Sequence, residues 1–356
     1  MKRIGFIVGN QLRQIRLLHA DRIPEGDFGL MRFGWIAAAV NRRPEHGLRY
    51  ELYRPWRRYD ALVFVKAMGP RDRALRDRAR RAGLKTIFDA NVNYYDRAGT
   101  FYYDGMAPTD LQRQEAEDMT RGCDAVIADS RFLAERCAPL NSRVRWIPDN
   151  VNLDLVPPRQ TSGSSAGPLE LVWSGQAAKL FELLAIEEVL RAHRARIRLT
   201  LVTNSLEVLQ TWQPDLRERF ERLLADVPHE VRPYTSVADL LAFYASRRCV
   251  CLSPRFDDNS YNLGHTEWKI ALAMACGRLA LAGSVPSYRV VAERSGGQGM
   301  WLCTTAAEWS AAFDRLHAGR LDWNAEELAA REVVEKFYST ETVAAEHAEF
   351  MKGVLA

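Results

Sequence analysis

The sequence predicts an α/β fold with two Rossmann-like domains, each built on a doubly wound parallel sheet, that face each other across a cleft. Short apolar runs alternate with longer amphipathic stretches, a pattern typical of parallel strands covered by helices. The alternation stops once, in a segment rich in Pro, Gly and Ser, and then resumes. A chain of 356 residues also has a length typical of two domains.

Each half of the chain contains its own series of predicted strands. In the first half they cover residues 4–8, 61–65, 85–89, 125–128 and 144–147, with helices over 30–40, 72–82 and 110–121. In the second half the strands cover 169–173, 198–203, 231–234, 250–252, 279–282 and 300–303, and one long helix ends at His193. The predicted domains are therefore 1–155 and 169–335, with a linker at 156–168. The tail at 336–356 is predicted as a helix that packs back on the first domain.

Composition excludes several classes of protein. The chain is 47% hydrophobic and carries a net charge of only +4, which excludes extensive disorder. It has no run of 18 apolar residues, and the apolar stretch near the N-terminus is too short for a signal peptide. The six cysteines form no CxxC pair and lie at no metal-ligand spacing, so we expect reduced thiols in a cytoplasmic protein without a metal site.

Positive charge is concentrated in the first half of the chain. Residues 1–150 contain 27 Lys and Arg against 19 Asp and Glu, while the remainder contains 22 against 26. A helix predicted over 71–81 carries six of the arginines. This helix has two interpretations: a solvated surface, or a peripheral contact with anionic lipid at the inner membrane face. Nucleic-acid binding is a third possibility for the basic half, but no RNA- or DNA-binding motif accompanies the charge.

The segment 253–277 concentrates polar chemistry after a predicted strand. A loop rich in Asp, Asn, His and Glu leads into a short apolar helix that ends at Gly277. Lys269 lies in the first turn of this helix, where a cation opposes the local dipole. Unpaired N–H groups at a helix start favour an anion such as phosphate, and an anion would also explain the lysine.

Three segments resemble the family 4 type of GT-B glycosyltransferase (glycosyl transferases group 1). Residues 269–277 (KIALAMACG) are similar to the family's K/L-x-x-E-A-M-A-C/A-G. Residues 144–152 (VRWIPDNVN) resemble its hinge strand V-x-V-I-P-N-G-V-D, and 124–130 (DAVIADS) resemble A-D-x-V-I-A-x-S. The segments occur in the family's order, so the resemblance covers nearly the whole chain. It implies a GT-B fold, a nucleotide-diphosphate sugar donor, retention of anomeric configuration and no metal cofactor.

The same resemblance marks the chain as atypical. The family's two donor-site glutamates, eight residues apart, fall here on Gly264 and Leu272. The loop offers His265 and Glu267 as substitutes, and these are the candidate catalytic residues. Asn262 and Gly264 are candidate donor-binding residues of the same loop, together with Lys269.

Other candidate contacts follow from the family's use of the same positions. In 173–179 (WSGQAAK), Gly175 permits close approach of the backbone, and Lys179 matches the basic residue that reaches the donor diphosphate. In the first domain, Arg32 follows a Gly-rich turn and is predicted to reach the cleft. Asn91 and Tyr94, in the polar loop after the strand at 85–89, are candidates for acceptor binding.

The predicted function is transfer of a sugar from a nucleotide-diphosphate donor to a saccharide or lipid-linked acceptor. Two alternatives stay open within the fold: a transferase-like protein that binds a nucleotide sugar without turnover, and a nucleotide-sugar epimerase. A third alternative, from another class, is a basic nucleic-acid-binding protein.

Overall fold

The structure is a computed structural model that describes residues 1–19, 22–24, 26–103, 105–158 and 167–356. In these ranges the strands form two six-stranded sheets, and every pair of neighbouring strands is parallel. The strands are β1 (Lys2–Val8), β2 (Leu48–Leu52), β3 (Ala61–Val65), β4 (Lys85–Ala90), β5 (Ala125–Ala128), β6 (Val144–Trp146), β7 (Leu169–Ser174), β8 (Ile197–Thr203), β9 (His229–Pro233), β10 (Val250–Ser253), β11 (Ala280–Gly283) and β12 (Met300–Cys303).

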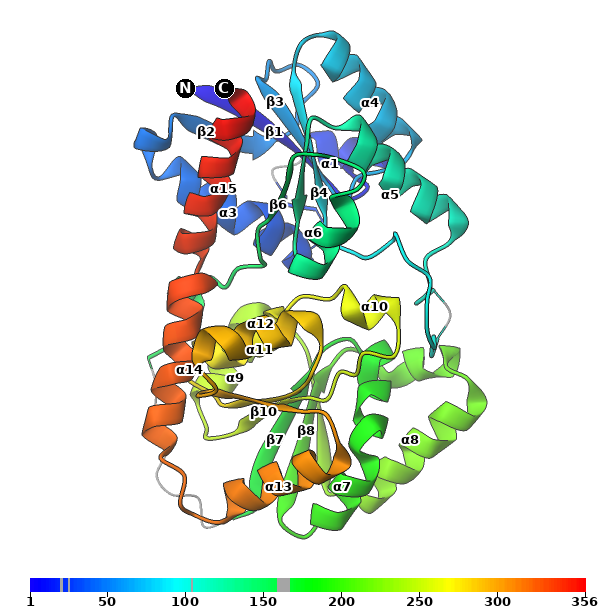
Figure 1. Ribbon diagram of the computed structural model, residues 1–356, viewed down its shortest axis with the longest axis vertical. Helices are drawn as coiled ribbons and strands as arrows, with labels where there is room; N and C mark the ends of the chain where they lie inside the picture. Colours follow the sequence, from blue (N-terminus) through cyan, green and yellow to red (C-terminus); the bar gives the residue numbers. More distant parts are fainter. Residues whose placement is uncertain (20–21, 25, 104, 159–166) are drawn as a thin grey trace.

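The strand order of both sheets is doubly wound. The N-terminal sheet runs β2-β1-β3-β4-β5-β6 and the C-terminal sheet runs β12-β11-β10-β7-β8-β9. Helices cover both faces of each sheet, and the two lobes lie one above the other in Figure 1. This confirms the predicted fold class. In the second sheet the order reverses between β7 and β10, and ligands of such sheets bind at the carboxyl ends of the strands at this point.

One strand, β2, is missing from the predicted set. Its sequence LRYEL alternates buried Leu48, Tyr50 and Leu52 with more exposed Arg and Glu, because it forms the edge of the sheet. Continuous apolar runs predict buried strands, whereas the apolar residues of an edge strand occur at every second position.

Two of the helices predicted from the sequence differ from those in the structure. The α-helices of the structure are α1 (Ile15–His19), α2 (Gly26–Gly29), α3 (Trp35–Asn41), α4 (Pro70–Arg81), α5 (Asp110–Gly122), α6 (Arg131–Cys137), α7 (Glu187–His193), α8 (Pro214–Asp226), α9 (Val237–Ala245), α10 (Ser260–Leu263), α11 (Trp268–Ala275), α12 (Pro286–Ser295), α13 (Ala306–His317), α14 (Trp323–Phe337) and α15 (Thr340–Leu355). The helix expected over 30–40 begins instead as a π-helix, η2 (Leu30–Gly34), before α3. The single long helix expected to end at His193 is wrong: a 3-10 segment, η5 (Ala177–Ile186), precedes α7.

The C-terminal tail crosses from one lobe to the other (Figure 1). Helix α14 packs on α11 of the second lobe, whereas α15 packs on α3 of the first. Val343, Ala348 and Met351 of α15 are fully buried in the core that also contains Phe6 and Ile36. Of the predicted linker 156–168, residues 159–166 lie outside the described residues. No described helix is both long enough and apolar enough to cross a membrane.

Replacing Met351 by Ala should destabilise the N-terminal lobe. The side chain is fully buried, so its loss leaves a cavity that costs about 2–5 kcal/mol. The matched control is Lys352→Ala, an exposed neighbour that should change stability by less than about 0.5 kcal/mol. Urea denaturation measures both, and equal values for the two variants would contradict the packing of α15 described above.

Candidate functional site

A cavity of about 620 Å³ lies between the two lobes, at the carboxyl ends of both sheets. Both lobes contribute to its wall. Its lining residues are Asp27, Phe28, Met31, Lys66, Asn91, Val92, Asp129 and Asp149 from the first lobe, and Ser174, Gly175, Gln176, Lys179, Asn204, Tyr234, Leu240, Arg255, Tyr261, His265, Thr266, Trp268, Lys269 and Leu272 from the second.

The position of the cavity follows from the parallel sheets, because their strands all end at one edge. Lys66, Asn91 and Asp129 directly follow β3, β4 and β5. In the second lobe, Gly175 follows β7 and Arg255 lies two residues after β10, the two strands at which the order reverses. Side chains far apart in sequence therefore meet at one place.

In the part of the chain that the structure describes, four cationic side chains line the cavity: Lys66, Lys179, Arg255 and Lys269. Arg255 and Lys269 share a counter-ion, Glu182, which is 1% exposed and lies behind the wall. Its Oε1 accepts from Arg255 Nε at 3.1 Å and its Oε2 accepts from Lys269 Nζ at 2.8 Å. Lys269 Nζ also lies 4.3 Å from the centre of the Trp173 ring. One carboxylate and an aromatic face thus hold two cations in place.

Burial and mutual repulsion shape the titration of these groups. Burial and the nearby Arg255 lower the pKa of Lys179 to about 8. Burial also lowers the pKa of Lys269 to about 8, although Glu182 opposes the shift. For Glu182, burial alone would raise the pKa, but Lys269 and Arg255 outweigh it and lower the pKa to about 2. Clustered, partly dehydrated cations of this kind gain the most when an anion binds among them.

His265 joins the same cluster. Lys179 Nζ lies 3.3 Å from His265 Nε2, and the Tyr261 ring meets the imidazole edge-on with ring centroids 4.3 Å apart. Burial, Lys179 and Arg255 hold the pKa of His265 well below its usual range. The imidazole is therefore neutral, and Nε2 accepts a hydrogen bond from the Lys179 ammonium.

Lys66 enters the cavity from the opposite lobe on an unusual backbone. Its φ of 53° is left-handed, which is uncommon for a residue with a side chain and is typical of functional sites. Its Nζ lies 5.3 Å from the centre of the Phe28 ring. The left-handed turn places this lysine opposite the cations of the second lobe.

The remaining wall of the first lobe is anionic and rests on Arg32. This arginine is fully buried and donates to Asp89 Oδ1 at 2.8 Å, to Asp149 Oδ1 at 3.1 Å and to the carbonyl oxygens of Ile147 and Pro148. Asp149 Oδ2 accepts in turn from Thr266 Oγ1 at 2.7 Å, across the cleft. No group of three or more described His, Cys, Asp or Glu residues is arranged to hold a metal ion.

No model of a known protein family and no curated protein matches the sequence, but solved structures do. Sucrose-phosphate synthase from Thermosynechococcus elongatus is 14% identical, with a TM-score of 0.67 and 99% of each chain covered. HepE from Anabaena, in complex with UDP and glucose, is 13% identical, with a TM-score of 0.67 and 99% of each chain covered. A glycosyltransferase from Rickettsia africae is 13% identical, with a TM-score of 0.63, covering 99% of this chain and 90% of its own.

The chain has the GT-B fold. At such low identities the likeness shows the fold alone. In this GT-B chain the cleft predicted between the lobes contains the cationic cavity. Five predicted residues line that cavity: Asn91, Gly175, Lys179, His265 and Lys269. The space beside Gly175 is already filled, since a Cβ there would lie 3.1 Å from the Trp173 ring.

Three predicted residues of the 253–277 loop do not line the GT-B cavity, and the structure gives each another place. The Asn262 side chain donates to the Phe256 carbonyl and shapes the loop. Gly264 packs against the other lobe, where an added Cβ would lie 2.4 Å from the Cβ of Asn93. Glu267 precedes α11 and is 2% exposed. Its side chain does not line the cavity, so the structure does not place Glu267 beside a substrate there, as the sequence predicted.

Two predicted contacts from the first lobe also need correction. Arg32 does not reach the cavity, because Asp89 and Asp149 hold it in the interior beneath the wall. Tyr94 is half-buried against the core of the first lobe and does not line the cavity.

Sequence reasoning missed three functional groups: Lys66, Glu182 and Arg255. The signal for Lys66 and Arg255 was present, since Lys66 directly follows the predicted strand 61–65 and Arg255 lies three residues after the predicted strand 250–252. Glu182 gave no signal, because it lies in a 3-10 segment that was expected to be an ordinary helix.

Glu267→Gln should change how stability depends on pH. Burial and Asp149 raise the pKa of Glu267 to about 8, so the folded protein keeps a proton that the unfolded chain releases above its ordinary pKa of 4.5. This contribution to stability is present at low pH and is lost as pH rises toward 8, by about 1.4 kcal/mol per pH unit at most. The variant carries no such proton, so its stability relative to wild type should improve by a few kcal/mol between pH 5 and 8.5.

Urea denaturation at the two pH values measures this difference. Glu45→Gln, at an exposed position, is the matched control and should follow the wild type. Parallel pH dependence of wild type and Glu267→Gln would contradict the raised pKa.

Proposed function

We propose that this protein transfers a sugar from a nucleotide-diphosphate donor to a saccharide or lipid-linked acceptor. The observation that carries the proposal is the cluster of Lys66, Lys179, Arg255 and Lys269 around one cavity between the lobes. Pyrophosphate is the anion that such a cluster matches in charge and size. HepE, which shares the fold, is described in complex with UDP-glucose and with UDP.

In the proposed reaction the bond between the anomeric carbon and the diphosphate breaks as an acceptor oxygen bonds to that carbon. The diphosphate leaves with the bonding electrons, and the acceptor hydroxyl gives its proton to the departing diphosphate oxygen. Lys179, Lys269 and Arg255 stabilise the developing charge, and their fixed positions avoid reorganisation during the reaction. We propose that this replaces a metal ion and that configuration is retained, as the resemblance of residues 269–277 implies.

We assign contacts with the donor sugar and with the acceptor to two residues by their positions in the cavity. His265, which faces the cavity beside Lys179, would contact the donor sugar, and Asn91 would contact the acceptor from the other lobe. The closed contact between Thr266 and Asp149 would keep water from the donor, which it would otherwise hydrolyse.

A second candidate is a protein on the same fold that binds a nucleotide sugar without turnover, or that epimerises it. It is favoured by the place of Glu267, because the carboxylate expected next to the sugar is turned into the interior. Incubation with UDP-glucose separates these functions. Transfer to an acceptor or to water releases UDP, epimerisation returns an isomeric UDP-sugar, and simple binding changes nothing.

Lys179→Ala should abolish most of the nucleotide binding. A thermal-shift screen with UDP, GDP, ADP, CMP and TDP identifies the base, and a nucleotide at a hundredfold excess over its Kd stabilises by about 2.7 kcal/mol. Lys179 makes its hydrogen bond to His265, so its removal leaves the Glu182 pairs intact. We expect at least a tenfold loss of affinity, as for a charged hydrogen bond. Lys85→Ala, an exposed lysine far from the cleft, should bind normally; an unchanged response in Lys179→Ala would rule out its contact with phosphate.

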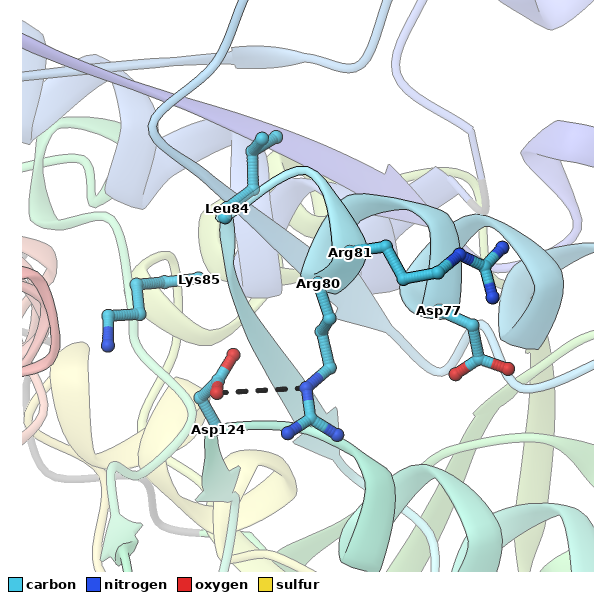
Figure 2. Close-up of a pocket in the computed structure, with 7 residues that line it drawn as sticks. Asp77, Arg80, Arg81, Leu84, Lys85 and Asp124 are labelled. Atoms are coloured by element: carbon cyan, nitrogen blue, oxygen red, sulfur yellow. Dashed lines mark ion pairs between the residues drawn. The ribbon is translucent and has the colours of Figure 1, made fainter.

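The opposite end of the first lobe supports a peripheral membrane contact. A depression of about 510 Å³ lies at the end of α4. Arg80, Arg81 and Lys85, which line it at the amino edge of the sheet, are drawn in Figure 2. Arg80 Nε lies 3.8 Å from Asp124 Oδ1, and Arg78 and Arg81 are exposed. We propose that this end of the protein contacts anionic lipid at the inner membrane face, with the cleft on the side away from the bilayer.

The triple variant Arg78→Ala, Arg80→Ala, Arg81→Ala should bind anionic vesicles less well. Each basic residue near such a surface contributes about 1 kcal/mol, so the loss should exceed a hundredfold. Co-sedimentation with vesicles of phosphatidylserine and phosphatidylcholine measures it. The control replaces Arg194, Arg217 and Arg222 of the second lobe. Equal binding by both variants would exclude α4 as the contact.

A further inference from the structure

The wall of the cavity is not uniformly cationic. Lys179, Arg255 and Tyr261 lie beside one core of the second lobe, the core that contains Trp173 and Phe181. Leu240 and Leu272 belong to the other core, and Met31, Tyr234 and Trp268 pack against it. The cavity therefore has a diphosphate-binding side and an apolar side. A ligand that fills both carries a largely uncharged, ring-containing group next to its phosphates.

The apolar side contains one carboxylate, Asp27, which comes from the first lobe. Tyr234 Oη donates to Asp27 Oδ2 at 2.5 Å across the cleft. Among the described residues, none donates a hydrogen bond to Oδ1, although Asp27 lines the cavity. This oxygen is thus available to a ligand.

Asp27 lies on a firmly held segment. Helix α2 runs directly into the π-helix η2, which carries the buried Arg32 and its bonds to Asp89 and Asp149. Gly29 packs so closely that a Cβ would lie 1.8 Å from the Pro24 carbonyl oxygen. The carboxylate is consequently presented from a fixed backbone, which lowers the entropic cost of a ligand contact.

We propose that Asp27 binds the vicinal hydroxyls of a ribose, so that the ligand is a ribonucleoside diphosphate. The proposal rests on the function proposed above and names the residue that holds the nucleoside. A carboxylate accepts both hydroxyls of a cis-diol, as acidic residues do in other nucleotide sites. Each carboxylate oxygen has two lone pairs, so Oδ1 and the second lone pair of Oδ2 remain for the diol beside the bond from Tyr234. The other two carboxylates of the wall are placed differently: both oxygens of Asp149 are already engaged by Arg32 and Thr266, and Asp129 is 3% exposed, where burial and the charge of Asp149 raise its pKa and so favour its neutral form.

Because Asp27 belongs to the first lobe and Lys179, Arg255 and Lys269 belong to the second, a ribonucleotide bridges the cleft. Pyrophosphate has no hydroxyls and needs only the cations. Comparison of a ribonucleotide with pyrophosphate therefore distinguishes binding at Asp27 from binding at the cations.

The test is calorimetric titration of the full chain with UDP, 2′-deoxyuridine diphosphate and pyrophosphate. Wild type should bind UDP at least tenfold more tightly than the deoxy compound. In Asp27→Ala the affinity for UDP should fall about tenfold or more, to that of the deoxy compound, while pyrophosphate binding stays unchanged and shows that the site is intact. Tyr234→Phe removes the bond between the lobes but keeps the carboxylate, so it should retain the preference for UDP.

Three results would overturn the assignment: equal affinity of wild type for UDP and the deoxy compound, an equal loss of all three ligands in Asp27→Ala, or loss of the preference in Asp129→Asn but not in Asp27→Ala. Failure of wild type to bind either UDP or pyrophosphate would instead refute the proposed function, and the assignment of Asp27 with it.

Discussion

The structure depends on one buried charge, the guanidinium of Arg32. It joins the π-helix η2 to the end of β4 and to the hinge after β6, and Asp149 extends the connection to Thr266 of the second lobe. Removal of one partner from such a set leaves an unpaired charge in the interior and typically costs about 3–5 kcal/mol. An uncharged residue could pack in the same volume, but it would not fix three backbone segments at once. Through Asp149 and Thr266 the network also contributes to the relative position of the lobes, which shapes the cavity.

In the second lobe, Glu182 stabilises cations that lie close together in the absence of a ligand. It pairs with both Arg255 and Lys269 and accepts a further hydrogen bond from Trp173 Nε1 at 3.3 Å. A single carboxylate neutralises only part of the charge, because Lys179 and Lys66 also face the cavity. The excess positive charge therefore lies on the cavity side, where the proposed diphosphate would neutralise it. Burial and neighbouring cations lower the pKa values of Lys179 and Lys269, so holding these charged groups together before a ligand binds costs free energy.

Sequence periodicity predicted the fold well because buried parallel strands give continuous apolar runs, and eleven of the strands in the described residues were found in this way. The edge strand β2 was missed because only alternate residues are buried. The lining of the cavity was predicted in part: Lys269, in the first turn of a predicted helix, was found, whereas Lys66, directly after a predicted strand, was not. The role of Arg32 was not visible, since its partners lie 57 and 117 positions away. Nor was the burial of Glu267, because the charged residues near it, Asp149 and Arg294, are distant in sequence.

The lobes are joined on both sides of the cavity. On one side the chain passes through the hinge after β6 and returns through α14 and α15; on the other, the segment 96–103 crosses between the lobes (Figure 1). Ser260 Oγ donates to the Asp96 carbonyl, and Tyr103 Oη donates to Tyr261 Oη at 3.2 Å. Tyr261 is the residue that packs against His265. The crossing segment is thus linked through the Tyr261 ring to His265 and the cationic cluster.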